Sequence, residues 1–158
     1  MDEQPLQEYV WAIGTAILAL NEAESEIFSL LQQLIEGEQS ELPEQELEAT
    51  MSRLEACVFS EKINRIEEIA NHCNPAVRTR LIAIVAEGRR LGDERNNFAH
   101  GLLWFNPFDG KPQRRFAPKR TTQPMHDART PQQIIDVSLE IEKLTTDVIV
   151  IATELRKS

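Results

Sequence analysis

The sequence lacks any apolar run long enough to cross a bilayer. A membrane-spanning helix needs about 18–20 consecutive apolar residues. The longest candidate, from Val10 to Leu20, is interrupted by Gly14 and Thr15. The N-terminus opens with Met1-Asp2-Glu3 and has no basic stretch before a hydrophobic one, so we expect neither a membrane anchor nor a secretory signal.

Cysteine is scarce, and the motifs of metal- and nucleotide-dependent enzymes are missing. Cys57 and Cys73 are the only cysteines, and we expect both to be reduced thiols in the core of a cytoplasmic protein. The sequence has no Gly-rich phosphate loop, no Gly-x-Gly-x-x-Gly, and no His-x-x-x-His or Cys-x-x-Cys pair. A site made of His72, Cys73 and Cys57 can be drawn, but residues scattered in this way are weak evidence for a metal. We therefore expect no metal and no cofactor.

Positive charge is scarce outside one segment of a chain whose net charge is −9. In residues 1–87, 17 acidic and 5 basic groups give a net charge of −12, whereas 9 basic and 4 acidic groups give residues 88–129 a net charge of +5. The positive segment can attract a polyanion, or it can simply form a solvated loop. The RNA-binding candidates in it are Arg90, Trp104, Lys111, Arg114, Arg115, Lys119 and Arg120.

Helical periodicity, by contrast, is abundant. It predicts five helices, over about 6–35, 43–54, 60–73, 75–98 and 131–155. Ser60, Asn74 and Thr130 are the expected N-caps of the last three, and proline follows the last two of these caps. No repeat or linker interrupts the pattern. The sequence therefore predicts one all-α domain over residues 1–158, a four- to five-helix bundle.

The apolar spacing also predicts which face of each helix is buried. In the first helix the expected core stripe is Leu6, Val10, Ile13, Ile17, Phe28, Leu31 and Ile35. In the short acidic second helix it is Leu47, Met51 and Leu54. In the last helix Ile134, Val137, Ile141, Leu144, Val148, Ile151 and Leu155 form a seam for packing within the bundle or across a dimer. Gly88 and Gly92, one turn apart, either allow another helix to approach the fourth closely or leave room beside Arg95, and close packing is the simpler interpretation.

About thirty residues separate the fourth and fifth helices, which is long for a bundle connection. The stretch from Leu102 to Phe105 is β-prone, and Asp109-Gly110 is a good hairpin turn. We therefore expect a small β-hairpin or a basic flap over about 102–129, anchored by Trp104, Phe105, Phe108 and Phe116. These rings either pack on the bundle or stack on nucleic-acid bases.

The segment from Arg95-Asn96 to Ala99-His100-Gly101 stands at the expected end of the fourth helix. An Arg followed by Asn, with four residues between the Arg and a His at the end of a bundle helix, resembles the HEPN family, the higher eukaryotes and prokaryotes nucleotide-binding domain. Some subfamilies place a Tyr two residues after the His, where this chain has Leu102. That departure puts regulation by nucleotide transfer onto such a Tyr in doubt.

The resemblance implies metal-independent RNA cleavage by a homodimer whose two motifs face each other. His100 would act as general base on a ribose 2′-hydroxyl or as acid toward the leaving oxygen, since imidazole titrates near neutrality. Arg95 would pair with the scissile phosphate and stabilise charge in the transition state. Asn96 would orient the phosphate or the His. Such a toxin or defence RNase implies an antitoxin or regulatory protein as a further partner.

Glu24 falls near the centre of the apolar face of the first helix, flanked by Asn21. One hypothesis is that Glu24 or Asn21 faces the motif and orients Arg95 or His100. The other is a structural ion pair of Glu24 with Arg95 or Arg90, since buried charges need partners.

Two further interpretations of the whole chain stay open. One is a catalytically silent HEPN-like module that binds nucleic acid, nucleotide or a partner protein. The other is an acidic helical interaction protein in which the motif occurs by chance.

Overall fold

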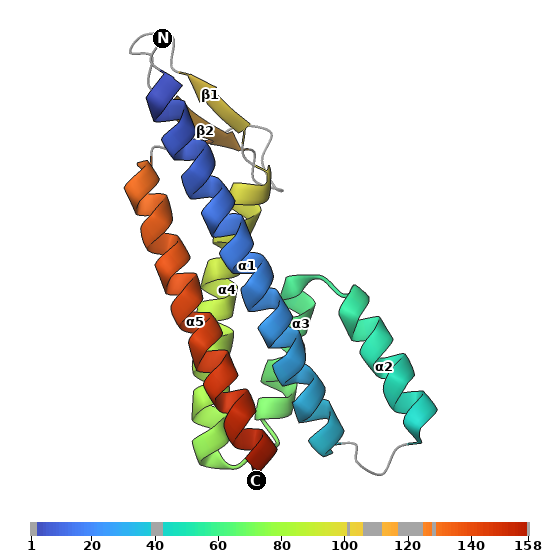
Figure 1. Cartoon of the computed structure of the whole chain (residues 1–158). Coiled ribbons are helices and arrows are strands. Elements are labelled where there is room, and N and C mark those ends of the chain that lie inside the picture. The colour runs from blue at the N-terminus through green and yellow to red at the C-terminus, as the bar shows by residue number, and fades with distance from the viewer. Residues whose placement is uncertain are drawn as a thin grey trace. The chain divides into compact units, whose positions relative to one another are not determined.

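The computed structural model describes the backbone of residues 3–38, 43–100, 102–105, 112–116, 125–127 and 129–157, and the side chains of residues 6–37, 43–94 and 129–157. It contains five helices: α1 (Glu3–Glu38), α2 (Glu44–Ala56), α3 (Phe59–Ala70), α4 (Pro75–His100) and α5 (Pro131–Lys157) (Figure 1). The predicted set of five helices is confirmed. Within the described part of the chain, no helix combines the length and the apolar character that spanning a membrane requires.

Two of the three expected N-caps are present. The Asn74 carboxamide oxygen accepts a hydrogen bond from the Val77 backbone N–H at 3.0 Å. At the start of α5, the Thr130 hydroxyl accepts from the Gln133 N–H at 3.2 Å, and the Gln133 side chain accepts from the Thr130 N–H at 2.8 Å. This reciprocal pair is a capping box, which satisfies two N–H groups that a helix start otherwise leaves unpaired.

The expected cap at Ser60 is wrong. α3 begins one residue earlier, at Phe59, with Val58 in the cap position and no side-chain hydrogen bond. The reason is the burial of an apolar side chain. Phe59 is only 5% exposed, and its place in the first turn of α3 buries its ring. Burial of a large side chain outweighs the roughly 1 kcal/mol that a side-chain cap contributes.

The contacts within the chain divide it into two compact units. The first unit comprises Met1–Leu20 and Asp93–Ile141, and the second comprises Asn21–Gly92 and Glu142–Ser158. α1, α4 and α5 each contribute residues to both units, whereas α2 and α3 belong to the second alone. The prediction of a single domain stays a prediction.

The second unit is a helical bundle with an aliphatic core. Its fully buried large side chains are Ile27, Leu30, Leu31 and Ile35 of α1, Ile63 and Ile66 of α3, and Leu81, Val85 and Leu91 of α4. A Cβ built on Gly88 would lie 2.5 Å from Ile63 Cδ1, and one on Gly92 would lie 3.2 Å from the Phe59 ring. The two glycines therefore allow α3 and α4 to pack closely, as their spacing predicts.

α2 departs from its expected packing. Leu47, Met51 and Leu54 were expected to face the core, but none of the residues of α2 is buried. These three side chains are only partly covered. A thirteen-residue helix with four glutamates gains little from burial on one short stripe, so its apolar face stays at the surface.

The first unit buries a different side of α1 from the one that was expected. Tyr9, Ala12, Ala16 and Leu20 are buried, whereas Val10 is 58% and Ile17 36% exposed. The expected core stripe is therefore wrong at Val10 and Ile17, although Leu31 and Ile35 further along α1 are fully buried. On α5 the predicted seam is buried from Ile134 through Ile151, and Leu155 is partly covered.

Three short strands lie between α4 and α5: β1 (Leu102–Phe105), β2 (Pro112–Phe116) and β3 (Met125–Asp127). They pair antiparallel in the order β1-β2-β3, with Leu102 opposite Arg115 and Arg114 opposite Asp127. This backbone alone does not support the expected basic flap, because every flap side chain except that of Arg129 lies outside the described residues.

The two cysteines are free thiols, as expected, but they are not core residues. Both Cys57 and Cys73 are partly exposed, since each lies at or just beyond the end of a helix. A hydrogen bond with the Glu61 side chain raises the pKa of the Cys57 thiol above its ordinary value. Cys57 is therefore a weaker nucleophile at neutral pH than a cysteine with the ordinary pKa, because the thiolate is the reactive form.

Candidate functional site

The candidate motif occupies the last turns of α4, which is helical through His100, two residues further than expected. Arg95 and His100 are five positions apart, so they lie about 140° apart around a regular helix. The side chains of Arg95, Asn96 and His100 lie outside the described residues. Their proposed roles therefore stay predictions, whereas their place on the final turns of a helix is given by the backbone.

The described residues next to the motif form a small polar cluster, which we call the Tyr9 cluster: Tyr9, Glu94 and Arg129. Glu94, which directly precedes Arg95, forms an ion pair with Arg129. The Tyr9 hydroxyl donates a hydrogen bond to the Arg129 backbone carbonyl at 2.9 Å. The side chains of Arg129 and Glu94 are 23% and 25% exposed, so the ion pair is partly shielded from water.

The Tyr9 cluster fixes both ends of the segment that follows the motif. It connects the start of α1, the end of α4 and the residue before the Thr130 cap of α5. Sequence reasoning missed this cluster, since it counted Arg129 only as one charge of the positive segment. The available signal was its position directly before the Thr130-Pro131 helix start.

Glu24 forms an ion pair that neither sequence hypothesis included. The Lys62 Nζ of α3 lies 3.0 Å from Glu24 Oε1, and the Lys62 side chain is only 7% exposed. The same Nζ lies 5.7 Å from the centroid of the Phe28 ring, within range of a cation–π contact. Lys62 is thus one partner of Glu24, and a lysine on the apolar stripe of α3 was the signal that could have found this pair.

The predicted contact of Glu24 or Asn21 with the motif stays a prediction. Glu24 and Asn21 belong to the second unit, whereas Arg95 and His100 belong to the first. Asn21 is exposed. Of the two arginines considered as structural partners of Glu24, Arg90 forms an ion pair at 2.9 Å with Glu87, one turn earlier on α4.

The RNA-binding candidates are distributed over a helix, two strands and undescribed residues. Arg90 lies on α4 with its side chain 46% exposed, so it is accessible although paired with Glu87. Trp104 lies in β1, and Arg114 and Arg115 lie in β2. Lys111, Lys119 and Arg120 lie outside the described residues.

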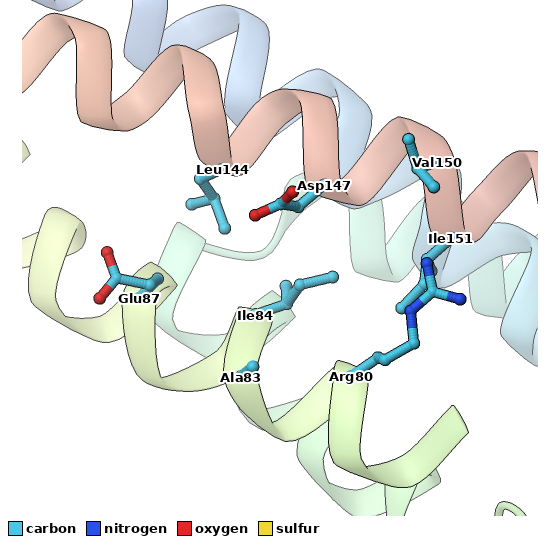
Figure 2. Close-up of a pocket in the computed structure, with 8 residues that line it drawn as sticks. All are labelled: Arg80, Ala83, Ile84, Glu87, Leu144, Asp147, Val150 and Ile151. Carbon is cyan, nitrogen blue, oxygen red and sulfur yellow. The ribbon is translucent and has the colours of Figure 1, made fainter. Parts of the chain in front are cut away.

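A groove of about 210 Å³ lies between α4 and α5 in the second unit. Ile84, Leu144 and Ile151 contribute to its apolar lining, and the Asp147 and Glu87 carboxylates and the Arg80 guanidinium stand at its edges (Figure 2). Arg80 is already paired with Glu154. Because the groove presents uncompensated carboxylate at Asp147 among the described residues, it does not suit a phosphate-bearing ligand.

Metal ligands are not clustered in the part of the chain that the structure describes. There, no group of three or more His, Cys, Asp or Glu side chains could hold a metal ion. In particular, each cysteine donates to a helix carbonyl four residues earlier in the sequence, Cys57 to Arg53 of α2 and Cys73 to Ile69 of α3.

Comparison with protein-family models, with curated proteins and with solved structures finds no match for this chain. The HEPN resemblance therefore rests on the residues of the motif and on the helical context alone.

Proposed function

We propose that the chain is a metal-independent endoribonuclease of HEPN type that acts as a homodimer in the cytoplasm. One observation carries the proposal: the Arg95-Asn96 pair and His100 occupy the final turns of α4, one of five helices in the described part of the chain. An Arg and a His spaced in this way occur by chance in many proteins. Their combination with the end of a bundle helix is what supports a nuclease site.

The proposed reaction is a transesterification followed by release of the leaving strand. His100 accepts the proton of a ribose 2′-hydroxyl, and the 2′-oxygen attacks the adjacent phosphorus. The bond from phosphorus to the 5′-oxygen breaks, and that oxygen takes up a proton from the partner's His100. Arg95 stabilises the negative charge that gathers on the phosphate oxygens, and Asn96 holds the phosphate by a hydrogen bond.

The helical geometry favours a site that two copies share. Because α4 is helical through His100, Arg95 and His100 lie on different sides of the same helix. A single copy therefore presents the two groups poorly to one phosphate. Two motifs that face each other supply an Arg and a His from opposite sides, which removes this difficulty.

The positive segment supplies the proposed RNA contacts. A basic flap over about 102–129, with Trp104, Lys111, Arg114, Arg115, Lys119 and Arg120, would hold phosphates and stack bases. The Tyr9 cluster supports this role, since it fixes the ends of that segment beside the motif. The strongly acidic remainder of the chain limits non-specific RNA binding and suits a basic antitoxin or regulatory protein.

RNA cleavage by the purified chain in the presence of EDTA tests the proposal. We expect wild type to cut RNA and His100→Ala to lose at least about 100-fold in rate, as the loss of a general acid–base group does. His72→Ala is the matched control, because His72 is exposed on the turn after α3 and lies outside the motif. Circular dichroism establishes that each variant is folded.

Folded wild-type protein that leaves RNA intact would overturn the proposal. If that protein still bound RNA or nucleotide, the catalytically silent module would replace it. Equal cleavage by wild type and His100→Ala would show that the motif is not the site.

A further inference from the structure

α1 carries a second apolar face, which is exposed in the described part of its unit. Leu18 is 70%, Trp11 66% and Val10 58% exposed, and Ile17 is 36% exposed. Single exposed apolar residues are ordinary, but a contiguous patch usually marks a contact. Trp11 and Leu18 are seven residues apart, which places them within about 20° of each other around the helix. These four side chains therefore form one patch, which we call the Trp11 face.

The Trp11 face is on the far side of α1 from its buried side. The buried residues of the same turns are Ala12, Ala16 and Leu20, which lie roughly opposite Trp11 and Leu18 around the helix axis. The helix cannot turn to bury the Trp11 face without exposing this packed side. Covering the Trp11 face therefore needs a surface that the described residues do not supply.

The charge of α1 limits what can cover it. The helix contains no Lys or Arg over its whole length of 36 residues. Helices that lie on membrane surfaces are usually rich in Lys and Arg on their polar side, and nucleic acid needs cations. An apolar protein surface is the chemistry that fits.

The order of residues on the Trp11 face is nearly the same in both directions from Gly14. Toward the N-terminus, the face carries Trp11 and Val10 and then Gln7. Toward the C-terminus, it carries Ile17 and Leu18 and then Asn21. Gln7 and Asn21 are exposed. A two-fold axis requires a surface that complements itself, and an antiparallel copy would set Trp11 against Leu18 and amide against amide.

Gly14 stands at the centre of this symmetric pattern. A Cβ built on Gly14 would meet nothing within 4 Å, so no contact inside the chain requires a glycine there. Glycine in a helix interior costs about 0.5–1 kcal/mol relative to alanine. A glycine at the centre of an apolar face would let a second helix approach closely, which gives Gly14 a purpose.

We propose that the Trp11 face is a self-association surface, on which α1 of a second copy packs antiparallel with the two Gly14 residues at the crossing point. The inference goes beyond the proposed function, because it identifies the contact from α1 alone and does not depend on RNA cleavage. The four apolar side chains leave on the order of 400 Å² open per copy, so the contact falls in the range of weak, concentration-dependent dimers.

Sedimentation equilibrium of the full chain tests the surface. We expect a monomer–dimer equilibrium at micromolar concentration for wild type. Leu18→Glu should raise the dissociation constant by about 100-fold or more, because an unpaired carboxylate would be buried in the contact. Ile149→Glu is the control, since Ile149 is an exposed isoleucine of α5 in the second unit and should leave the constant unchanged.

Disulfide trapping tests the antiparallel arrangement. In a Cys57→Ser/Cys73→Ser background, Trp11→Cys and Leu18→Cys proteins are mixed and oxidised mildly. The antiparallel contact predicts mixed disulfides between the two variants, which mass spectrometry identifies. Predominant self-pairing of either variant would contradict the arrangement.

A wild-type chain that stays monomeric at high micromolar concentration would overturn the proposal, and so would a dimer that Leu18→Glu leaves intact. The first outcome would also contradict the homodimer of the proposed nuclease, whereas the second would overturn the Trp11 face alone. A dimer sensitive to Leu18→Glu that does not cut RNA would contradict only the nuclease proposal.

Discussion

At the scale of single residues, the packing of α3 on α4 depends on Gly88. A Cβ at this position would lie 2.5 Å from Ile63 Cδ1, well inside van der Waals contact, so the isoleucine would have to move. Ile63 is fully buried and has little room to do so. Gly37, by contrast, has nothing within 4 Å of such a Cβ.

Gly88→Ala should therefore lower the free energy of unfolding by about 1–2 kcal/mol, since overpacking outweighs the gain in helix propensity. Gly37→Ala, where only propensity changes, should be neutral or stabilising by up to about 1 kcal/mol. Urea denaturation followed by circular dichroism measures both. A Gly88→Ala protein as stable as Gly37→Ala would contradict the close approach of the two helices.

The ion pair of Lys62 with Glu24 is a second feature that single substitutions can test. Lys62→Met removes the charge that faces Glu24 while keeping an apolar stem of similar length, and we expect a loss of about 2 kcal/mol. Adding Glu24→Gln should recover part of that loss, because it removes the carboxylate that had lost the Lys62 ammonium. A double-mutant cycle in urea measures the coupling. Strictly additive losses would show that the two side chains do not interact.

At the scale of elements, α5 was predicted well and the first half of α1 was not. On α5 the apolar residues are large and occupy one stripe, so periodicity identifies the buried face without ambiguity. On α1 two sides of the helix are apolar: one carries the larger residues Val10 and Ile17, and the other carries Ala12 and Ala16. Size favoured the wrong side, because the spacing of apolar residues alone does not show which side of a helix packs in the core.

The candidate site shows the same division between local and long-range information. The place of Arg95 and His100 at the end of α4 follows from periodicity and from Gly101. The pairs Glu24–Lys62 and Glu94–Arg129 join residues 38 and 35 positions apart, and nothing local specifies such partners. Sequence reasoning therefore located the motif but not the ion pairs around it.

The capping box at the start of α5 predicts a measurable contribution from one hydroxyl. Thr130→Ala removes the acceptor of the Gln133 N–H and should cost about 1 kcal/mol of unfolding free energy. Thr146→Ala is the control, because that hydroxyl donates to a carbonyl in the middle of α5 and its loss should be nearly neutral. Equal effects in thermal denaturation would contradict the cap.

The contact of α3 with α4 at Glu67 and Arg89 predicts a pH dependence. Arg89 donates to Glu67 Oε1 at 3.2 Å and lowers the pKa of that carboxyl below its ordinary value of 4.5. A carboxyl whose pKa is lower in the folded state stabilises the protein above its unfolded pKa, and this stabilisation is lost as the pH falls through the folded value.

Glu67→Gln should therefore be less stable than wild type at neutral pH, and the difference should disappear at a pH well below 4.5. Because the pair is exposed, the difference is small. Chemical denaturation at both pH values measures it, with the exposed Glu48→Gln of α2 as control. A difference that persists in acid would mean that the carboxylate charge is not its cause.

At the scale of the whole molecule, the charge distribution and the arrangement of the helices both bear on the proposed nuclease. An acidic chain contains the motif within a positive segment, residues 88–129, and the Tyr9 cluster connects Glu94 and Arg129 of that segment with α1. The account therefore predicts a protein that binds RNA weakly in general and cuts it where Arg95 and His100 act together.

The chemistry of the cut RNA ends tests this account most directly. A homogeneous RNA oligonucleotide is incubated with the wild-type chain in EDTA, and the products are identified by mass spectrometry. Cleavage through His100 and the ribose 2′-oxygen predicts a 2′,3′-cyclic phosphate on one product and a 5′-hydroxyl on the other. Products with a 3′-hydroxyl and a 5′-phosphate, or an RNA that folded protein leaves intact, would contradict it.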